Sequence, residues 1–301
     1  MSRPKEPELR HRLEYFFFRR FGKAILNRPH EEVGAFGARL GRWGHQLVPK
    51  ARKTALGNLQ RVFPEMSAEE RERIVYDCFQ HFGVHFCELL SLERFDGEEA
   101  LDYFELEGWH HIEELRERGE GFFLHSGHIG HWDMALFPFS ILLRPFNAVV
   151  RPPNNPLVNR DVIELRKRLG AGIIEKKGAA FKMRSAYRRG ENVGIIVDQH
   201  VRPSAGIRIP FLGIDAWTSP ILAVLALRLR APVVPFVCWP TEKSGHYRLE
   251  FRAPIRPEEV VDDLRGEDAQ AKFTCRVLEE VENDIRRRPE LWLWMHRRWR
   301  D

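Results

Sequence analysis

The chain has 301 residues, 43% hydrophobic and 30% charged, so it has enough apolar content for a sizeable core and enough charge for a well-solvated surface. Its formal net charge of +5 favours anionic partners such as phosphates, acidic carriers or anionic lipid, and does not indicate nucleic acid. The four cysteines are widely scattered without a Cys-x-x-Cys pair, which argues against a disulfide framework and against a zinc knuckle.

Residues 1–115 have mainly helical periodicity and open with a basic amphipathic segment. Hydrophobic side chains recur there at helical spacing with basic side chains between them: Leu9, Leu13, Phe16, Phe17, Phe21, Ala24 and Ile25, with Arg10, Arg12, Arg19, Arg20 and Lys23. Such a helix either packs on the rest of the protein or docks on an anionic membrane surface. Because no apolar run of about 18 residues and no signal peptide is visible, we expect a protein of the cytosol or of the cytosolic face of a membrane.

A capping box at Ser67-Ala-Glu-Glu70 predicts a long helix to about Glu93. From residue 120 onward, short strand patterns alternate with helical ones. We predict strands over 121–124, 146–150, 172–175, 193–197, 233–237 and 247–251, and helices over 157–169, 179–189, 219–230 and 269–288. The fold class is therefore α/β, with a mostly parallel or mixed central sheet flanked by helices. We expect the helical region and this core, 116–301, to form one continuous domain.

The turn after the first core strand carries a candidate catalytic pair, His128 and Asp133. On a regular helix, residues five apart lie about 140° apart around the axis and do not meet. If the strand ends near His125 and a helix begins near Trp132, the bend at the intervening glycines folds Asp133 back towards His128. A histidine oriented by a carboxylate is a general base able to take a proton from a hydroxyl.

The spacing of His125, His128 and His131 also permits two other interpretations of this turn. One is a metal site, although zinc needs convergent ligands and partners that fix them, and spacing alone supplies neither. The other is a purely structural turn. We favour the catalytic pair and expect no metal.

Polar side chains follow two further strands of the core. Arg151, in the proline-rich segment after the strand over 146–150, and Arg166, on the next helix, are candidates for holding a phosphate or phosphopantetheine group. Asp198 lies where the strand over 193–197 ends, a common place for functional carboxylates in α/β folds. The apolar loop that comes next, 209–220, either lines an acyl-chain groove or closes the core.

The C-terminal segment, 291–300, alternates aromatic and apolar residues and then gathers arginines. It either covers the sheet and closes the domain or joins a basic surface that faces the membrane. The sequence alone does not distinguish these two roles.

Taken together, the ordered motifs resemble the bacterial lipid A late acyltransferase family, within the lysophospholipid acyltransferase group. They are His128-Ile-Gly-His-Trp-Asp133 for the family's His-x4-Asp/Glu turn, Arg151-Pro-Pro-Asn-Asn-Pro156, Asp198-Gln199, Pro210-Phe-Leu-Gly213, Ala231-Pro-Val-Val-Pro235 and Arg288-Pro-Glu-x-x-Leu-Trp-x-His-Arg-Arg298. The chain also resembles the phosphatidylinositol mannoside acyltransferases, which are peripheral and share a similar turn, so the acceptor stays open.

The resemblance implies transfer of a fatty acyl group from an acyl carrier protein or coenzyme A thioester to a hydroxyl of a membrane lipid or glycolipid. His128 is then the general base and Asp133 its orienter, without any cofactor. The implied substrate-binding residues are Arg151, Asn154, Arg166, Asp198, Gln199, His131 and Trp132. The implied location is the cytoplasmic face of the bacterial inner membrane, as a peripheral protein. The alternatives are a metal-dependent hydrolase that uses His125, His128 and His131, and a non-catalytic lipid-binding protein.

Overall fold

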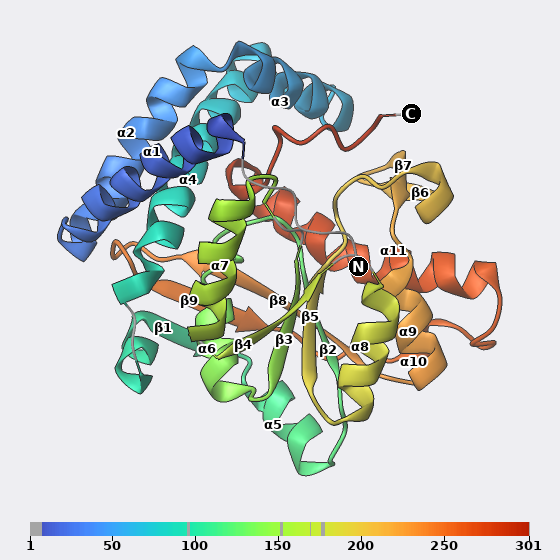
Figure 1. Cartoon of the computed structure of the whole chain (residues 1–301). Helices are drawn as coiled ribbons and strands as arrows, with labels where there is room; N and C mark the ends of the chain where they lie inside the picture. The colour runs from blue at the N-terminus through green and yellow to red at the C-terminus, as the bar shows by residue number, and fades with distance from the viewer. Residues whose placement is uncertain (1–7, 95–96, 151–152, 169, 176–177, 301) are drawn as a thin grey trace.

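Long helices occupy the N-terminal part of the protein and lie together on one side of it (Figure 1). The computed structural model describes residues 8–94, 97–150, 153–168, 170–175 and 178–300. The N-terminal helices are α1 (Leu9–Leu26), α2 (His30–Leu47), α3 (Pro49–Val62) and α4 (Ala68–Ser91). The predicted capping box is present, since Ser67 Oγ accepts from the Glu70 N–H and the Glu70 carboxylate accepts from the Ser67 N–H.

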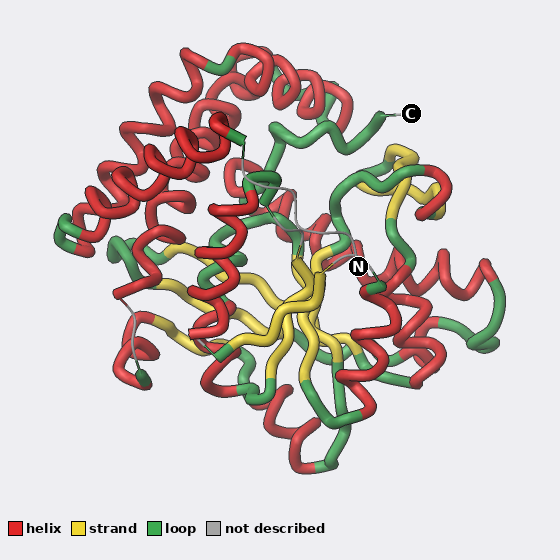
Figure 2. Tube along the Cα trace, in the orientation of Figure 1, coloured by secondary structure: helices red, strands yellow, loops and turns green. Residues whose placement is uncertain are grey.

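A seven-stranded sheet forms the centre of the described core, with helices around it (Figure 2). Its order is β1-β9-β8-β2-β5-β3-β4, and within the described residues all neighbouring strands are parallel except β8 and β9. The strands are β1 (Phe104–Glu107), β2 (Phe123–Ser126), β3 (Phe146–Val150), β4 (Ala171–Glu175), β5 (Asn192–Ile196), β8 (Val233–Pro240) and β9 (Tyr247–Phe251). The predicted fold class is confirmed.

Helices connect and cover these strands. They are α5 (His110–Glu117), α6 (Leu136–Leu142), α7 (Pro156–Arg168), α8 (Ala179–Arg188), α9 (Ile221–Leu229), α10 (Pro257–Val260) and α11 (Glu267–Arg287). Helices α7, α8, α9 and α11 lie close to where the sequence predicts them, whereas no individual helix was predicted at α5 or α10. Short 3-10 turns lie at Leu92–Arg94, Glu98–Tyr103, Pro203–Ala205 and Pro289–Leu291.

Three details differ from the sequence prediction. The helix expected near Trp132 begins only at Leu136, because turns continue up to that residue. The segment expected as an apolar loop forms a hairpin of β6 (Ile207–Phe211) and β7 (Ile214–Thr218), and β1 was not predicted. In the hairpin, Leu212 and Gly213 both have positive φ, a geometry that matches the twist of paired strands.

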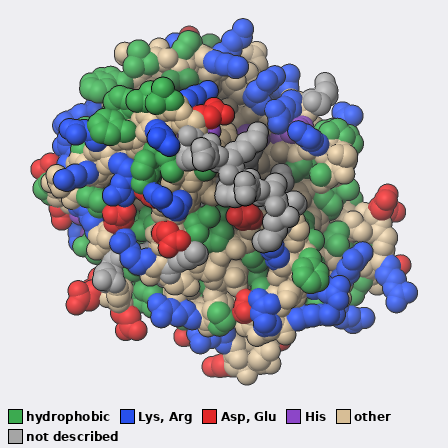
Figure 3. All heavy atoms as spheres, viewed as in Figure 1, with side chains coloured by type: hydrophobic (Ala, Val, Ile, Leu, Met, Phe, Trp, Pro, Cys, Tyr) green, Lys and Arg blue, Asp and Glu red, His purple; other side chains and the backbone are tan. Residues whose placement is uncertain are grey.

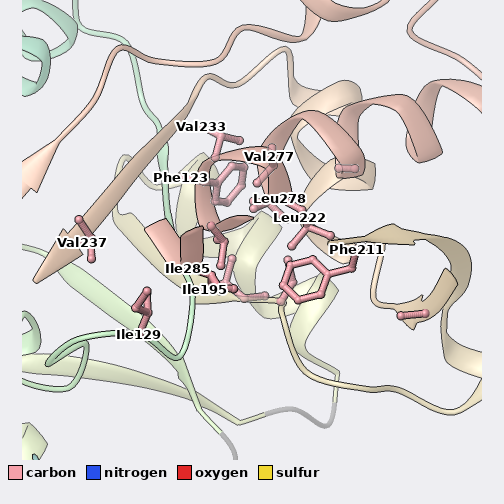
Figure 4. Packing of buried hydrophobic residues seen from close by; sticks show 14 of the residues in the cluster. Phe123, Ile129, Ile195, Phe211, Leu222, Val233, Val237, Val277, Leu278 and Ile285 are labelled. Atoms are coloured by element: carbon pink, nitrogen blue, oxygen red, sulfur yellow. The ribbon is translucent and has the colours of Figure 1, made fainter. Parts of the chain in front are cut away.

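Alternate residues of the central strands pack on opposite faces of the sheet. Phe123 and Val233 lie in one buried cluster together with Val277 of α11 (Figure 4), whereas Leu124 and Val234 belong to a second cluster on the other face. Phe211 of the hairpin and Trp292 of the C-terminal segment are also in the first cluster. Phe211 and Trp292 therefore help to close the core. This is one of the two roles that the sequence left open for each of their segments.

Helices α2 and α4 approach each other closely through glycines. A Cβ atom at Gly41 would lie 2.1 Å from the Phe79 carbonyl oxygen, and one at Gly83 would lie 2.2 Å from the Gly37 carbonyl oxygen. Larger side chains at these places would push the helices apart. This close packing holds α4 firmly, and α4 in turn contacts the candidate site. Among the helices of the described residues, none is both long and apolar enough to cross a membrane.

Candidate active site

His128 and Asp198 meet at the carboxyl ends of two neighbouring parallel strands. Strands β2 and β5 pair with Ser126 opposite Ile196, and each candidate residue follows two positions after its strand residue. The side chains therefore emerge at the same edge of the sheet, the place where α/β folds commonly hold ligands.

Direct hydrogen bonds join the two residues. His128 Nδ1 lies 2.6 Å from Asp198 Oδ1, and the His128 backbone N–H donates to Asp198 Oδ2 at 2.7 Å. The Trp292 indole N–H donates to the same Oδ2 at 2.9 Å. Asp198 is 1% exposed and the His128 side chain is 21% exposed, so the imidazole is the part of this pair that a substrate can reach.

The two partners shift each other's pKa in opposite directions. For Asp198, burial alone would raise the pKa, but the His128 charge and the hydrogen bonds from His128 and Trp292 lower it well below its ordinary value. For His128, burial works against the charged form, yet the charge of Asp198 and its hydrogen bond raise the pKa overall. Because the ionised carboxylate only accepts, it holds the neutral imidazole with its proton on Nδ1 and its lone pair on Nε2.

Asp133, which the sequence analysis assigned as the orienter of His128, is not the carboxylate on Nδ1. Its Oδ2 lies 3.4 Å from His85 Nε2 of helix α4, and its charge also contributes, less than that of Asp198, to raising the pKa of His128. Asp133 is the carboxylate nearest to His128 along the chain. The carboxylate on Nδ1, Asp198, instead follows β5, the strand next to β2 in the sheet.

The C-terminal segment holds the backbone of the turn that carries His128. The Gly130 N–H donates to the Leu291 carbonyl at 3.0 Å, and the Leu293 N–H donates to the His128 carbonyl at 3.1 Å. Gly130 has φ +61°, and a Cβ atom there would lie 2.3 Å from the Cys238 carbonyl oxygen. A glycine is needed at this position for both conformation and space.

Helix α4 supports the same turn from another side with a buried polar stripe. His81 Nε2 lies 3.1 Å from the Gly130 carbonyl oxygen, and Glu88 Oε2 lies 3.0 Å from His131 Nδ1. Burial raises the pKa of Glu88 to about 8 and lowers that of His131 well below its usual value, so burial disfavours the charged form of both side chains. The His131 side chain is only 1% exposed and faces Glu88 of α4. It therefore supports the turn from inside the protein.

The three histidines of the turn do not converge. His125 Nδ1 donates to the Ile195 carbonyl at 3.0 Å, while His128 and His131 contact Asp198 and Glu88. In the part of the chain that the structure describes, no group of three or more His, Cys, Asp or Glu residues is arranged to hold a metal ion. The geometry therefore gives no support to the metal-dependent alternative.

The remaining predicted substrate-binding residues have varied surroundings. Trp132 stacks on the His85 ring at 4.1 Å between centroids and lies 5.1 Å from the His128 ring. Gln199 is half-buried next to Asp198, and Asn154 is exposed before α7. Arg151 lies outside the described residues, and the side chain of Arg166 does too, although its backbone belongs to α7.

Further polar residues that the sequence analysis did not assign lie beside the pair. His296 Nε2 accepts from the His200 backbone N–H at 3.1 Å. Burial lowers the pKa of His296 to about 4, and the charges of Asp198 and His128 act on this pKa in opposite directions. Arg298 is fully buried and donates to the Trp217 carbonyl at 2.7 Å. Their common signal in the sequence was the C-terminal cluster of aromatic and basic residues.

An apolar pocket lies between α1, α4 and α7, with Leu136 of α6 in its lining. Its volume of about 590 Å³ is within the range of roughly 300–1,000 Å³ that is usual for small-molecule sites. Other lining residues include Phe16, Leu26, Phe86, Leu89, Val162 and Leu165. One of its lining residues, Leu136, follows Asp133 by three positions in the sequence.

The comparison with known sequences decides the family. The model of the family described as bacterial lipid A biosynthesis acyltransferase matches residues 3–301. The chain belongs to this family. A lipid A biosynthesis lauroyltransferase of Escherichia coli K12 is 24% identical over 277 residues, which cover 92% of this chain and 88% of that protein. A lipid A biosynthesis myristoyltransferase of the same organism is 26% identical over 258 residues, covering 86% and 78%.

As a member of the lipid A biosynthesis acyltransferase family, this protein is an acyltransferase. The resemblance drawn from the ordered motifs is thereby confirmed. A lipid A biosynthesis palmitoleoyltransferase of Escherichia coli K12 is a further relative, 24% identical over 286 residues that cover 93% of this chain and 90% of that protein.

Proposed function

We propose that this protein transfers a fatty acyl group from an acyl thioester to a hydroxyl of a lipid A-type glycolipid, with His128 as the general base and Asp198 as its orienter. The observation that carries the proposal is the 2.6 Å contact between His128 Nδ1 and the buried Asp198 carboxylate. This contact leaves the Nε2 lone pair on the accessible imidazole to receive a proton.

The proposed reaction is a direct transfer. His128 Nε2 takes the proton of the acceptor hydroxyl while the hydroxyl oxygen bonds to the thioester carbonyl carbon. The resulting oxyanion re-forms the carbonyl as the carbon–sulfur bond breaks, and the thiolate leaves with the proton from the imidazolium. Asp198 stabilises the imidazolium between these steps, because its negative charge lies against Nδ1. Atoms and charges balance without a covalent enzyme intermediate.

The apolar pocket between α1, α4 and α7 supports the acyl part of this proposal. Aliphatic and aromatic side chains dominate its lining, as an alkyl chain requires, and Arg19, Arg20 and Lys23 of α1 lie among the lining residues. We assign the fatty acyl chain to this pocket. The thioester carrier is either acyl carrier protein or coenzyme A.

Helix α1 supports a peripheral position on an anionic membrane surface. It is joined to α7 through Tyr15, whose hydroxyl donates to Asp161 at 2.7 Å, so it packs on the protein. Yet its outer face leaves Phe17 67% and Leu13 53% exposed. Figure 3 shows hydrophobic side chains lying between Lys and Arg side chains over the N-terminal helices. Aromatic side chains beside arginines suit the headgroup region of the cytoplasmic leaflet.

The transfer proposal is tested with purified protein, a lipid A precursor and acyl donors on each of the two carriers. We expect His128→Ala to abolish formation of the product with one additional acyl chain. His110→Ala is the matched control, because His110 is exposed on α5, which leads into the opposite end of β2. Undiminished transfer by the His128→Ala variant overturns the assignment of the base. If no product forms with either carrier, the proposed reaction is wrong.

The membrane proposal is tested by flotation with vesicles of phosphatidylcholine alone or with about a third phosphatidylglycerol. We expect binding to the anionic vesicles and weaker binding of the Phe17→Glu variant. Phe181→Glu is the control, since Phe181 is 76% exposed on α8, away from α1. Equal binding of the two variants would show that α1 is not the docking element.

A further inference from the structure

The indole of Trp292 is the third hydrogen-bond donor on the Asp198 carboxylate, after the Nδ1–H and the backbone N–H of His128. We infer that Trp292 is a positioning residue that fixes the orientation of Asp198 against His128. This inference rests on the proposed function and adds a residue from the C-terminal segment to the catalytic machinery.

The orientation of the Asp198 carboxylate depends on its partners. The χ2 torsion of an aspartate is broad, so the side-chain rotamer alone does not fix the plane of the carboxylate. His128 Nδ1 contacts Oδ1, whereas Trp292 Nε1 and the His128 N–H both contact Oδ2. The donor from Trp292 therefore limits rotation that would move Oδ1 away from His128 Nδ1.

Trp292 is itself held rigidly. It is 1% exposed, its ring makes an edge contact with that of Trp294 at 4.7 Å between centroids, and the Cys78 thiol lies 3.2 Å from its carbonyl oxygen. The next residue, Leu293, donates its N–H to the His128 carbonyl. One short segment thus holds both the carboxylate and the turn that carries the base.

Trp294 offers a matched control for the loss of packing. It is fully buried in the same segment, and its indole N–H donates at 2.6 Å to the Pro289 carbonyl rather than to Asp198. Trp292→Phe and Trp294→Phe each remove one buried indole donor and keep an aromatic ring. A purely structural role for Trp292 predicts similar effects of the two substitutions on activity.

The experiment measures kcat against pH for both variants and titrates the His128 ring by nitrogen NMR in the intact protein. We expect Trp292→Phe to lower kcat about 10- to 100-fold, the usual range for losing a hydrogen bond to a charged group, and Trp294→Phe to lower it less than about 3-fold. Without the indole donor, the Asp198 carboxylate can turn so that Oδ1 moves away from Nδ1, and it then stabilises the imidazolium less. The pKa of His128 and the acid limb of the kcat profile should therefore move to lower pH in the Trp292→Phe variant alone.

Equal kcat values and His128 titrations for the two variants overturn the inference. The NMR titration does not need turnover, so it tests Trp292 even if the transfer assay shows that the proposed function is wrong. If Trp292→Phe does not fold, 3-benzothienylalanine at position 292 keeps the bicyclic shape and lacks the N–H. An unshifted His128 titration in that protein overturns the inference equally.

Discussion

Replacing Asp198 by asparagine is the sharpest test of the histidine–carboxylate pair. Three donors converge on the Asp198 carboxylate, and an amide offers only one acceptor oxygen. If the amide oxygen faces His128 Nδ1, the amide NH2 meets the Trp292 and His128 backbone donors. If the amide is turned round, its NH2 faces Nδ1 and favours the tautomer whose Nε2 already carries the proton.

Both arrangements weaken the base, and the magnitude follows from the burial of the pair. Breaking a buried ion pair by removing one partner costs about 3–5 kcal/mol. At about 1.4 kcal/mol per factor of ten, this corresponds to a loss of roughly 10²- to 10⁴-fold in kcat if the whole cost falls on the imidazolium form. Asp198→Asn should therefore lose far more activity than Asp133→Asn, because Asp133 contributes less to the pKa of His128.

The assay is the pH dependence of acyl transfer by the Asp198→Asn and Asp133→Asn variants. Asp198 raises the pKa of His128, so its loss should move the acid limb of the kcat profile to lower pH. The reasoning is refuted if Asp133→Asn loses as much activity as Asp198→Asn, or if the acid limb of the Asp198→Asn variant stays in place. Either result would return the orienting role to Asp133.

Three further predictions concern the surroundings of the pair. Burial raises the pKa of Glu88 from 4.5 to about 8. Between pH 4.5 and about 8, Glu88 therefore binds up to one proton more in the folded than in the unfolded protein. As the pH rises through this range, the free energy of unfolding should fall by up to about 1.4 kcal/mol per pH unit. Urea titrations should show this slope flattened in Glu88→Gln, and an unchanged slope would contradict the neutral state of Glu88. Gly130→Ala should lower stability by more than about 2 kcal/mol in thermal unfolding and reduce transfer, whereas Gly57→Ala, with open space at its Cβ position, should not. Incubation with EDTA should leave transfer unchanged, since the turn histidines do not converge; a loss that zinc restores would support the metal-dependent alternative.

Local patterns in the sequence were sufficient for most of the elements. The capping box at Ser67 and Glu70 placed the start of α4, and the period of apolar residues placed β3 and β9 at their observed bounds. Strand β1 was not predicted although Phe104-Glu-Leu-Glu107 alternates apolar and polar residues, because it has only four residues and lies in the part of the chain whose periodicity is mainly helical. The sequence predicts a loop over 209–220, where the structure has the β6–β7 hairpin, because Pro210 and Gly213 interrupt the apolar pattern there.

The site was predicted only in part. His128 was identified because glycines, a histidine and a carboxylate follow an apolar strand, and Asp198 was identified at another strand end. Their partnership was not predicted. The buried stripe of His81, His85 and Glu88 also went unnoticed, since polar residues on a long amphipathic helix are usually assumed to face solvent.

The sequence by itself determined most of the helices and strands, the family and the candidate base, because periodicity, caps and ordered motifs depend on residues close together in the chain. Only the tertiary structure decided which carboxylate holds His128. Strands β2 and β5 are neighbours in the sheet although about 70 residues separate them, and their parallel register brings His128 and Asp198 to the same edge. The hydrogen bond from Trp292 to Asp198 comes from the C-terminal end of the chain. The ring of Trp292 is buried in the same core cluster as Phe123 of β2, and this packing places its N–H against Asp198.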